Sequence, residues 1–241
     1  MVTSDVPSDR ILAPGQIVRR ARDWRLYDQS SRRYTDFWQA DGAAFLGHRP
    51  RGLARTVTAE IDRGLWAPLP SPWEARLEKV LASLARRVGV AALTIGPAAD
   101  RWRPLQGVAD AQPPDRTFHV TLPFPLGPAL DTGAVRSPVV LAGLVVAAGL
   151  LLRYLDLPEA QARLDLAASL PVPPGYCRCG VYWVPCPDSA AAAPDYESLR
   201  ARALGLDLVL PPRAEDPICC PGELGRRERQ NWEELCADRS G

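Results

Sequence analysis

The stretch Trp24–Leu84, WRLYDQSSRRYTDFWQADGAAFLGHRPRGLARTVTAEIDRGLWAPLPSPWEARLEKVLASL, organises the rest of the chain. Its first third predicts a hairpin. Short strands at Arg25–Asp28 and Arg33–Trp38 flank the polar turn residues 29–31, and both strands carry aromatic or aliphatic residues that favour extended backbone. We therefore expect a hairpin to begin the folded part of the chain.

Two helices are predicted after the hairpin. The first has apolar residues at every fourth position, at Leu53, Val57 and Ile61. The second has a strong start signal, because Ser71 can act as its N-cap, Pro72 suits its first position and Glu74 completes a capping box. Its predicted apolar face consists of Trp73, Leu77, Val80, Leu81 and Leu84.

This stretch resembles the N-terminal region of the class III aminotransferases, most nearly the glutamate-1-semialdehyde aminomutases, which use pyridoxal phosphate (PLP). The family opens with Leu-x-Asp-x-Asp-Gly-x-x-Tyr-x-Asp-Phe, followed by Leu-Gly-His-x-x-Pro. The family's Asp-Gly turn is Ser30-Ser31 here, and the later spacing to proline is compressed. The matching residues are Leu26, Asp28, Tyr34, Asp36, Phe37, Leu46, Gly47 and His48.

The resemblance implies an α/β chain, a reduced form of the PLP-dependent transferase fold (fold type I) with a C-terminal α+β small domain. We expect three parts: an N-terminal arm with the hairpin (1–70), a shortened remnant of the large domain (71–156) and the small domain (157–241). The apolar run Val139–Leu152 is too short to span a membrane and predicts a buried helix over 138–155. Ser137 and Pro138 supply its start signal.

Further elements follow from apolar patterning and from proline and glycine breaks. We expect His48, in the Gly-His turn, to make local hydrogen bonds. The other predicted elements are strands at 90–95, 117–124, 176–184, 206–210 and 218–220, and helices beginning near Pro158 (with Leu164 and Leu166 inward) and covering 195–204 and 224–237.

The composition is that of an ordinary globular protein, with 46% hydrophobic and 24% charged residues. A formal net charge of +1 gives no electrostatic reason to expect nucleic acid or an anionic membrane as a partner. The N-terminal residues contain no apolar core of a signal peptide. We therefore expect a cytoplasmic protein whose cysteines are free thiols.

The cofactor machinery of the family is largely absent from the sequence. The family holds the PLP phosphate with a Ser-Gly-Thr turn, and the matching residues here are Ile95-Gly96-Pro97. Proline has no N–H to donate, so Gly96 is the remaining cofactor-binding candidate of that turn. Ser137 is the second candidate, since it partly matches the family's Thr-Phe-Ser-Gly-Asn-Pro segment.

The family's Schiff-base lysine comes from a large domain, and the corresponding interval here, Pro97–Arg136, contains no lysine. Lys79 is the only lysine in the chain, and we interpret it as a surface charge on the second helix. We therefore predict no catalytic residue and no covalently bound cofactor, although the resemblance implies PLP.

Six cysteines form the other candidate site: Cys177, Cys179, Cys186, Cys219, Cys220 and Cys236. Cys177 and Cys179 would point to the same face of a strand. A four-thiolate zinc site with Cys219 and Cys220 is then geometrically possible. The usual Cys-x-x-Cys spacing is missing, which favours small buried thiols without metal.

The favoured function is a degenerate, catalytically silent aminotransferase-like protein that acts in binding or assembly. The alternatives are a cysteine-based metal-binding or redox protein, and a related enzyme with altered chemistry. In the family the retained regions approach a partner subunit, which implies a homodimer, or a heterodimer with a full-length aminotransferase. The aromatic residues expected at the interface, unless they fold onto their own core, are Trp24, Tyr27, Tyr34, Phe37, Trp38 and Trp66.

Overall fold

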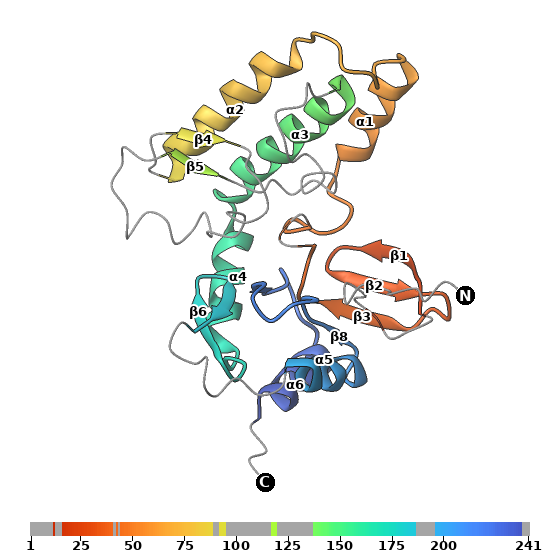
Figure 1. Ribbon diagram of the computed structural model, residues 1–241. Coiled ribbons are helices and arrows are strands. Elements are labelled where there is room, and N and C mark those ends of the chain that lie inside the picture. The colour runs from red at the N-terminus through yellow and green to blue at the C-terminus, as the bar shows by residue number, and fades with distance from the viewer. Residues whose placement is uncertain are drawn as a thin grey trace, which may run out of the picture.

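The computed structural model describes most of the chain, arranged as two lobes (Figure 1). The described residues are 12, 16–40, 42, 44–88, 92–94, 117–119, 137–186 and 196–237. One lobe contains helices α1, α2 and α3 and a small two-stranded sheet. The other contains two further sheets and helices α4, α5 and α6.

The first sheet confirms the predicted hairpin and extends it on both sides. Its strands are β1 (Val18–Arg22), β2 (Arg25–Asp28), β3 (Arg33–Asp36) and β8 (Leu208–Val209), in that order. The first three pair antiparallel, whereas β3 and β8 are parallel. Strand β1 was not predicted. The pairing of β3 with β8 makes one sheet from the N-terminal hairpin and the last third of the chain.

The turn between β2 and β3 is held by the Asp28 carboxylate. Its Oδ1 accepts hydrogen bonds from the backbone N–H groups of Ser30 and Arg32, both at 2.9 Å, and from the Ser30 hydroxyl. These bonds, that of the Ser30 hydroxyl first, hold the pKa of Asp28 below its ordinary value. Ser31 adopts a left-handed conformation with φ of 66°, so a serine carries the turn that the family makes with Asp-Gly.

Two helices of the helical lobe begin at their predicted N-caps, Ser71 for α2 and Ser137 for α3. The helices of the lobe are α1 (Leu53–Asp62), α2 (Trp73–Val88) and α3 (Pro138–Tyr154), and α3 packs against both of the others. The Ser71 hydroxyl accepts the backbone N–H of Trp73 at 3.3 Å, as expected of an N-cap. Ile61 was predicted to face inward but is 50% exposed, whereas the buried residues of α1 are Leu53 and Glu60.

The small sheet of this lobe pairs β4 (Ala92–Thr94) with β5 (Thr117–His119) in parallel. Both lie inside predicted strands. The remaining residues of those two predictions lie outside the described residues. No single helix in the described part of the chain has the length and apolar composition to cross a membrane. Helices α3 and α4, bent by 75° relative to each other, meet that criterion only as a pair.

The second lobe contains a sheet that differs from the prediction. The predicted single strand 176–184 is a hairpin, with β6 (Tyr176–Cys179) antiparallel to β7 (Tyr182–Pro185), which in turn pairs with β9 (Ile218–Cys219). Gly180 makes the turn with φ of 61°, a conformation that favours glycine. The helices of this lobe are α4 (Pro158–Ser169), α5 (Tyr196–Gly205) and α6 (Arg226–Cys236).

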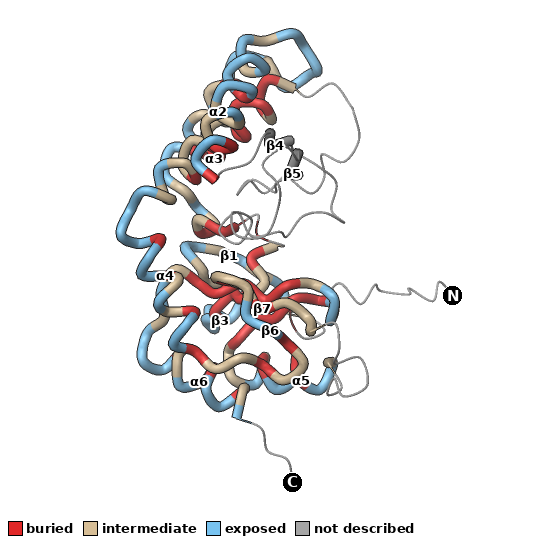
Figure 2. Tube along the Cα trace, turned by 90° about the vertical axis from the view of Figure 1, so that its left-hand side faces the viewer, coloured by how far each residue is buried: buried red, intermediate tan, exposed pale blue. Residues whose placement is uncertain are grey.

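Three aromatic side chains form the centre of this lobe, where buried residues concentrate (Figure 2). The rings of Phe37 and Trp232 stack with centroids 4.1 Å apart, and Trp183 lies 4.8 Å from Trp232. Trp232 Nε1 donates to the carbonyl of Pro171 at 3.0 Å. The core therefore joins the N-terminal hairpin, β7 and α6 through a single aromatic cluster.

The aromatic residues of the arm divide between core and surface. Tyr34 and Phe37 are buried in the chain's own core, whereas Trp66 is 71% exposed. Trp24 packs on Gly222, where any Cβ would collide with the indole ring. Some of the aromatic residues expected at an interface therefore pack into the chain's own core instead, whereas Trp66 lies on the surface.

Candidate functional site

The two predicted cofactor-binding residues have different outcomes. Ser137 is the N-cap of α3, and its hydroxyl accepts the backbone N–H of Val140 at 3.4 Å. Gly96 lies outside the described residues. The observed role of Ser137 is helix capping, and cofactor binding by the pair stays a prediction.

Lys79, the only lysine in the chain, lies exposed on the surface of α2. Its backbone carbonyl accepts the Ser83 hydroxyl in an ordinary helix-surface contact. No other side chain of the sequence carries a primary amine, and arginine cannot replace one because it stays protonated. The residues present therefore do not fit a covalently bound PLP.

His48 is hydrogen-bonded, as predicted, but its partners lie on the N-terminal hairpin and not within its own turn. Its Nε2 lies 2.7 Å from Oδ2 of the buried Asp36, and its backbone N–H donates to the carbonyl of Asp23 at 2.7 Å. Gly47 has φ of 87°, and a Cβ there would lie 3.0 Å from Asp23 Cα. The Leu46-Gly47-His48 turn is thus fixed by close backbone approach, which only glycine permits.

The first polar cluster found in the structure centres on Arg163 of α4, which has no exposed surface. Its Nε donates to the carbonyl of Cys220 at 2.8 Å, and its Nη1 to the carbonyl of Phe45 at 2.6 Å. Its Nη2 donates to Gln39 Oε1 at 3.0 Å. Among the described residues no carboxylate forms an ion pair with it. Arg163 therefore ties the end of β9 to the segment after β3.

The thiols beside this cluster are not activated by the arginine. Burial raises the pKa of Cys219 to about 11 and that of Cys220 to about 12, although the charge of Arg163 acts in the opposite direction. Both thiols are therefore protonated at neutral pH, and a thiol is a poor nucleophile. The Arg163 cluster is closed and holds the fold together.

The cysteines differ from the predicted set of free thiols. Cys177 and Cys186 form a disulfide between Cα atoms 5.3 Å apart, while Cys179, Cys219, Cys220 and Cys236 are free. Antiparallel pairing of β6 and β7 brings the two residues together, which a single predicted strand could not do. Within the described ranges no three His, Cys, Asp or Glu side chains are placed to hold a metal ion. The four-thiolate arrangement is therefore not formed.

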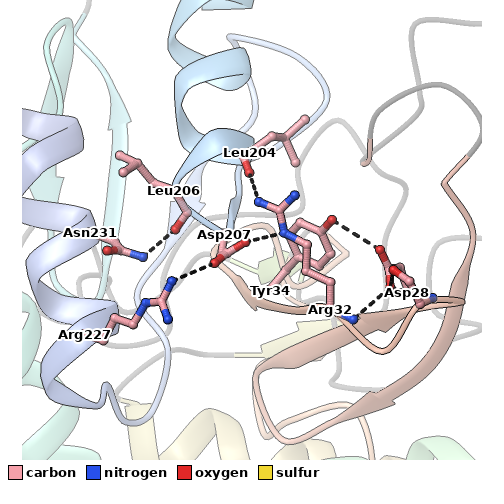
Figure 3. Close-up of polar contacts among 9 residues, drawn as sticks. Asp28, Arg32, Tyr34, Leu204, Leu206, Asp207, Arg227 and Asn231 are labelled. Carbon is pink, nitrogen blue, oxygen red and sulfur yellow. Dashed lines mark hydrogen bonds and ion pairs between the residues drawn. The ribbon is translucent and has the colours of Figure 1, made fainter.

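A second polar cluster surrounds a cavity of about 160 Å³ between the start of β3, the residue before β8 and the first turns of α6. Asp207 is one of its lining residues and lies between the guanidinium groups of Arg32 and Arg227 (Figure 3). Its Oδ1 accepts Arg32 Nε at 2.5 Å, and its Oδ2 is 3.6 Å from Arg227 Nη2. The lining residues are Arg32, Arg33, Thr35, Asp207, Arg227, Glu228 and Asn231.

The backbone around Asp207 explains how its carboxylate reaches the cavity. Asp207 follows the end of α5 with φ of 60°, a left-handed conformation that aspartate tolerates better than most residues. The carbonyl before it, that of Leu206, accepts Asn231 Nδ2 from α6 at 2.6 Å. The chain reversal after α5 is therefore anchored to α6, and it presents the carboxylate to both arginines.

Glu228 forms the other wall of the cavity. Its carboxylate accepts two hydrogen bonds from Arg25, at 2.9 and 3.1 Å, and one from the backbone N–H of Gly225 at 2.7 Å. Burial alone would raise its pKa, but the Arg25 hydrogen bonds and the Gly225 bond together lower the pKa of Glu228. The Arg33 guanidinium lies 3.6 Å from Glu228 Oε1, and the Arg33 side chain is half exposed.

Neither cluster was predicted from the sequence. Arg163 lies among helix-favouring residues of α4, and the predicted inward positions were its neighbours Leu164 and Leu166. The arginine pairs at 32–33 and 226–227 were visible, but arginine supplies almost all the basic charge of this chain. Arg32 and Asp207 are 175 residues apart, so only the folded chain shows that they meet.

Comparisons with known proteins support the fold expected from the resemblance. No protein-family model matches the chain. An ornithine aminotransferase from Plasmodium yoelii superposes with a TM-score of 0.57 at 11% identity, covering 92% of each chain. A transaminase with PLP bound gives a TM-score of 0.52 at 12% identity, covering 94% of this chain and 91% of the other. The chain has the fold of the PLP-dependent aminotransferases.

Similarity in sequence covers a shorter part of the chain than the structural superpositions do, and it includes an aminomutase of the kind that the first stretch resembles. A glutamate-1-semialdehyde 2,1-aminomutase from Aquifex aeolicus is 32% identical over 69 residues, which is 29% of this chain and 16% of that protein. An uncharacterized protein from Borreliella burgdorferi is 33% identical over 73 residues, 30% of this chain and 27% of that protein. The matches thus span about a quarter or less of these relatives.

Proposed function

We propose that this protein is a catalytically silent relative of the class III aminotransferases that acts through binding or assembly. The observation that carries the proposal is the position of Lys79, the only lysine, on the exposed surface of α2. PLP chemistry requires a lysine amine, both to hold the cofactor and to move the substrate proton. A solvent-facing helix position gives that amine no closed pocket in which to act.

The test is covalent trapping. Purified full-length protein is mixed with PLP and reduced with borohydride, and the modified residues are counted by mass spectrometry in the wild type and in Lys79→Arg. We expect substoichiometric labelling and no spectral response to added amino acids. Stoichiometric labelling of Lys79, abolished in Lys79→Arg and accompanied by such a response, contradicts the silent-enzyme proposal.

The assembly part of the proposal is supported by exposed apolar side chains at the end of α1 and on the segment that joins α1 to α2. Trp66 is 71% exposed, Ile61 50% and Leu69 43%. Large apolar side chains that gather on a surface are typical of protein interfaces, and tryptophan is enriched there. We propose that this segment mediates a homodimer, or a heterodimer with a full-length aminotransferase.

Sedimentation equilibrium at micromolar concentration tests the homodimer. We expect a dimer for the wild type, a monomer for Trp66→Ser, and no change for the control Leu157→Ser, which alters another exposed apolar residue (48%) between α3 and α4. A monomeric wild type excludes the homodimer. The heterodimer is then tested by mixing with a full-length class III aminotransferase of the same genome, and a lack of co-sedimentation excludes it as well.

The disulfide favours a second candidate, a thiol-based redox function. The Cys177 end of the bond is exposed, and the free Cys179 lies two residues away on the same strand. We expect a redox-active pair to be half reduced in glutathione buffers poised between about −180 and −300 mV, whereas structural disulfides resist such buffers. Mass-spectrometric thiol counting against buffer potential measures this, with Cys236→Ser as the control. A bond that stays oxidised across the range excludes the redox function.

A further inference from the structure

We propose that the cavity between β3 and α6 is a binding site for a phosphate group, either inorganic phosphate or the phosphate of a small monoester. The cavity is lined by residues from the start of β3, from the residue before β8 and from α6, and these elements lie in the lobe opposite α2 (Figure 1), the helix that carries Lys79. The phosphate-binding proposal is therefore independent of the proposed lack of transaminase activity, and a test can reject one of them without rejecting the other.

The guanidinium groups around the cavity have donors to offer. Arg33 approaches Glu228 at 3.6 Å and Arg227 approaches Asp207 at 3.6 Å, and both contacts are longer than a hydrogen bond. Their side chains are 54% and 80% exposed. Within the described residues these two arginines make no closer polar side-chain contact, so their N–H groups can turn toward an incoming oxyanion.

The charges around the cavity favour an anion. Three guanidinium groups line it against two carboxylates, and Glu228 is already paired with Arg25, which lies outside the lining. Asp207 is likewise engaged by Arg32. The carboxylates therefore orient the arginines while leaving an excess of positive charge, as expected of a site that binds a dianion.

The size and shape of the cavity favour a small tetrahedral oxyanion such as phosphate over a carboxylate. A volume of 160 Å³ corresponds to about five water molecules at about 30 Å³ each, and it is below the roughly 300 Å³ where pockets for drug-sized ligands begin. Arg32 and Arg33 line it from the start of β3 and Arg227 lines it from α6, and Figure 3 shows Arg32 and Arg227 on either side of Asp207. A tetrahedral group can accept from both sides at once, whereas a carboxylate offers two oxygens in one plane.

A neighbouring cavity on the β1–β2 hairpin is a weaker candidate. It is larger, about 340 Å³, and is lined by Arg19, Arg20, Tyr27, Asp28 and Ser31. One of its two arginines, Arg20, stacks on the Tyr27 ring at 4.1 Å. Guanidinium groups do not converge there from two elements, so we assign the phosphate site to the cavity between β3 and α6.

Isothermal titration calorimetry on the full chain at low ionic strength tests the proposal. The probes are inorganic phosphate, methyl phosphate and acetate, and the variants are Arg33→Gln and Arg227→Gln. Arg226→Gln is the matched control, because Arg226 is exposed on the same helix and does not line the cavity. Equal thermal midpoints establish that every variant is folded.

We expect one phosphate per chain, with affinity weakened about tenfold in each cavity variant, as for the loss of a charge-assisted hydrogen bond, and within about twofold of wild type in the control. Methyl phosphate binding as well as phosphate assigns the site to monoesters, and its failure to bind assigns the site to the free ion. The proposal is overturned by the absence of saturable phosphate binding, by equal weakening in Arg226→Gln, or by acetate binding as tightly as phosphate.

Discussion

Arg163 and Arg227 show how one residue type serves two opposite purposes in this molecule. Arg163 is fully buried and donates to two backbone carbonyls and a glutamine side chain. Arg227 is 80% exposed and makes one long contact with Asp207. The buried guanidinium is saturated by the protein itself, whereas the exposed one keeps its donors for a ligand.

The difference follows from the cost of desolvation. A buried guanidinium has lost its water, so every donor needs a protein partner, and removing the arginine leaves those partners unsatisfied in turn. An exposed guanidinium still binds water, so a protein partner adds little to stability. A buried arginine is therefore a structural element, and clustered exposed arginines are candidates for binding.

The largest effect is expected for Arg163→Met, which removes both guanidinium bonds to the buried Cys220 carbonyl and the bonds to Gln39 and to the Phe45 carbonyl, of which the last keeps a donor in Trp24 Nε1. Hydrogen bonds to charged groups contribute about 1.5–3 kcal/mol each, and Arg163 bonds three groups, so we expect a loss of about 3 kcal/mol or more in the free energy of unfolding, measured with urea. Arg153→Met, at an exposed position of α3, is the control and should change it by less than about 0.5 kcal/mol. A loss below about 1 kcal/mol for Arg163→Met would contradict the view that the buried Arg163 is structural and the exposed Arg227 is not.

An intermediate effect is expected for Glu228→Gln, which removes the two-pronged bond to Arg25. Hydrogen bonds to charged groups contribute about 1.5–3 kcal/mol, and we expect a loss in that range at pH 7. Glu223 bonds the same arginine at 3.1 Å from an exposed position. Glu223→Gln is therefore the matched control, with an expected loss under about 1 kcal/mol. Equal losses in the two variants would show that burial of the carboxylate does not decide its contribution.

The pH dependence sharpens the same prediction. Because the pKa of Glu228 is lowered in the folded protein from its ordinary value of 4.5, its contribution is fully present above pH 4.5. That contribution is lost as the pH falls through the lowered pKa. Urea titrations at several pH values below 5 should show a shallower decline for Glu228→Gln than for the wild type. Parallel curves would indicate that Glu228 does not carry this dependence.

The smallest effect on stability is expected for Arg227→Gln. Its exposed side chain and 3.6 Å contact predict a change under about 0.5 kcal/mol in the free energy of unfolding. Thermal and urea unfolding measure it alongside the phosphate titration. A cost above about 1 kcal/mol would place Arg227 with Arg163 as a structural residue and remove the distinction between the two clusters.

Much of the fold was predictable wherever a signal acts over a few residues. Asp28 and the serines after it mark the first turn, and Ser137 followed by Pro138 marks the start of α3. The hairpin β6–β7 was missed because its turn residue, Gly180, is a single glycine within a run rich in aromatic and β-branched residues. Strand β1 was missed because VRRAR has the composition of a solvated segment, and its extended form comes from pairing with β2.

The sequence by itself determined the hairpin, the helices with their caps and the absence of an interior lysine, because each depends on residue identity and near neighbours. Tertiary structure alone decided that β3 pairs with β8, that Cys177 meets Cys186, and that Arg163 is buried. It also decided that Arg32 meets Asp207 across 175 residues. Such contacts depend on which surfaces pack together, and packing minimises the free energy of the whole chain, so no local pattern records it.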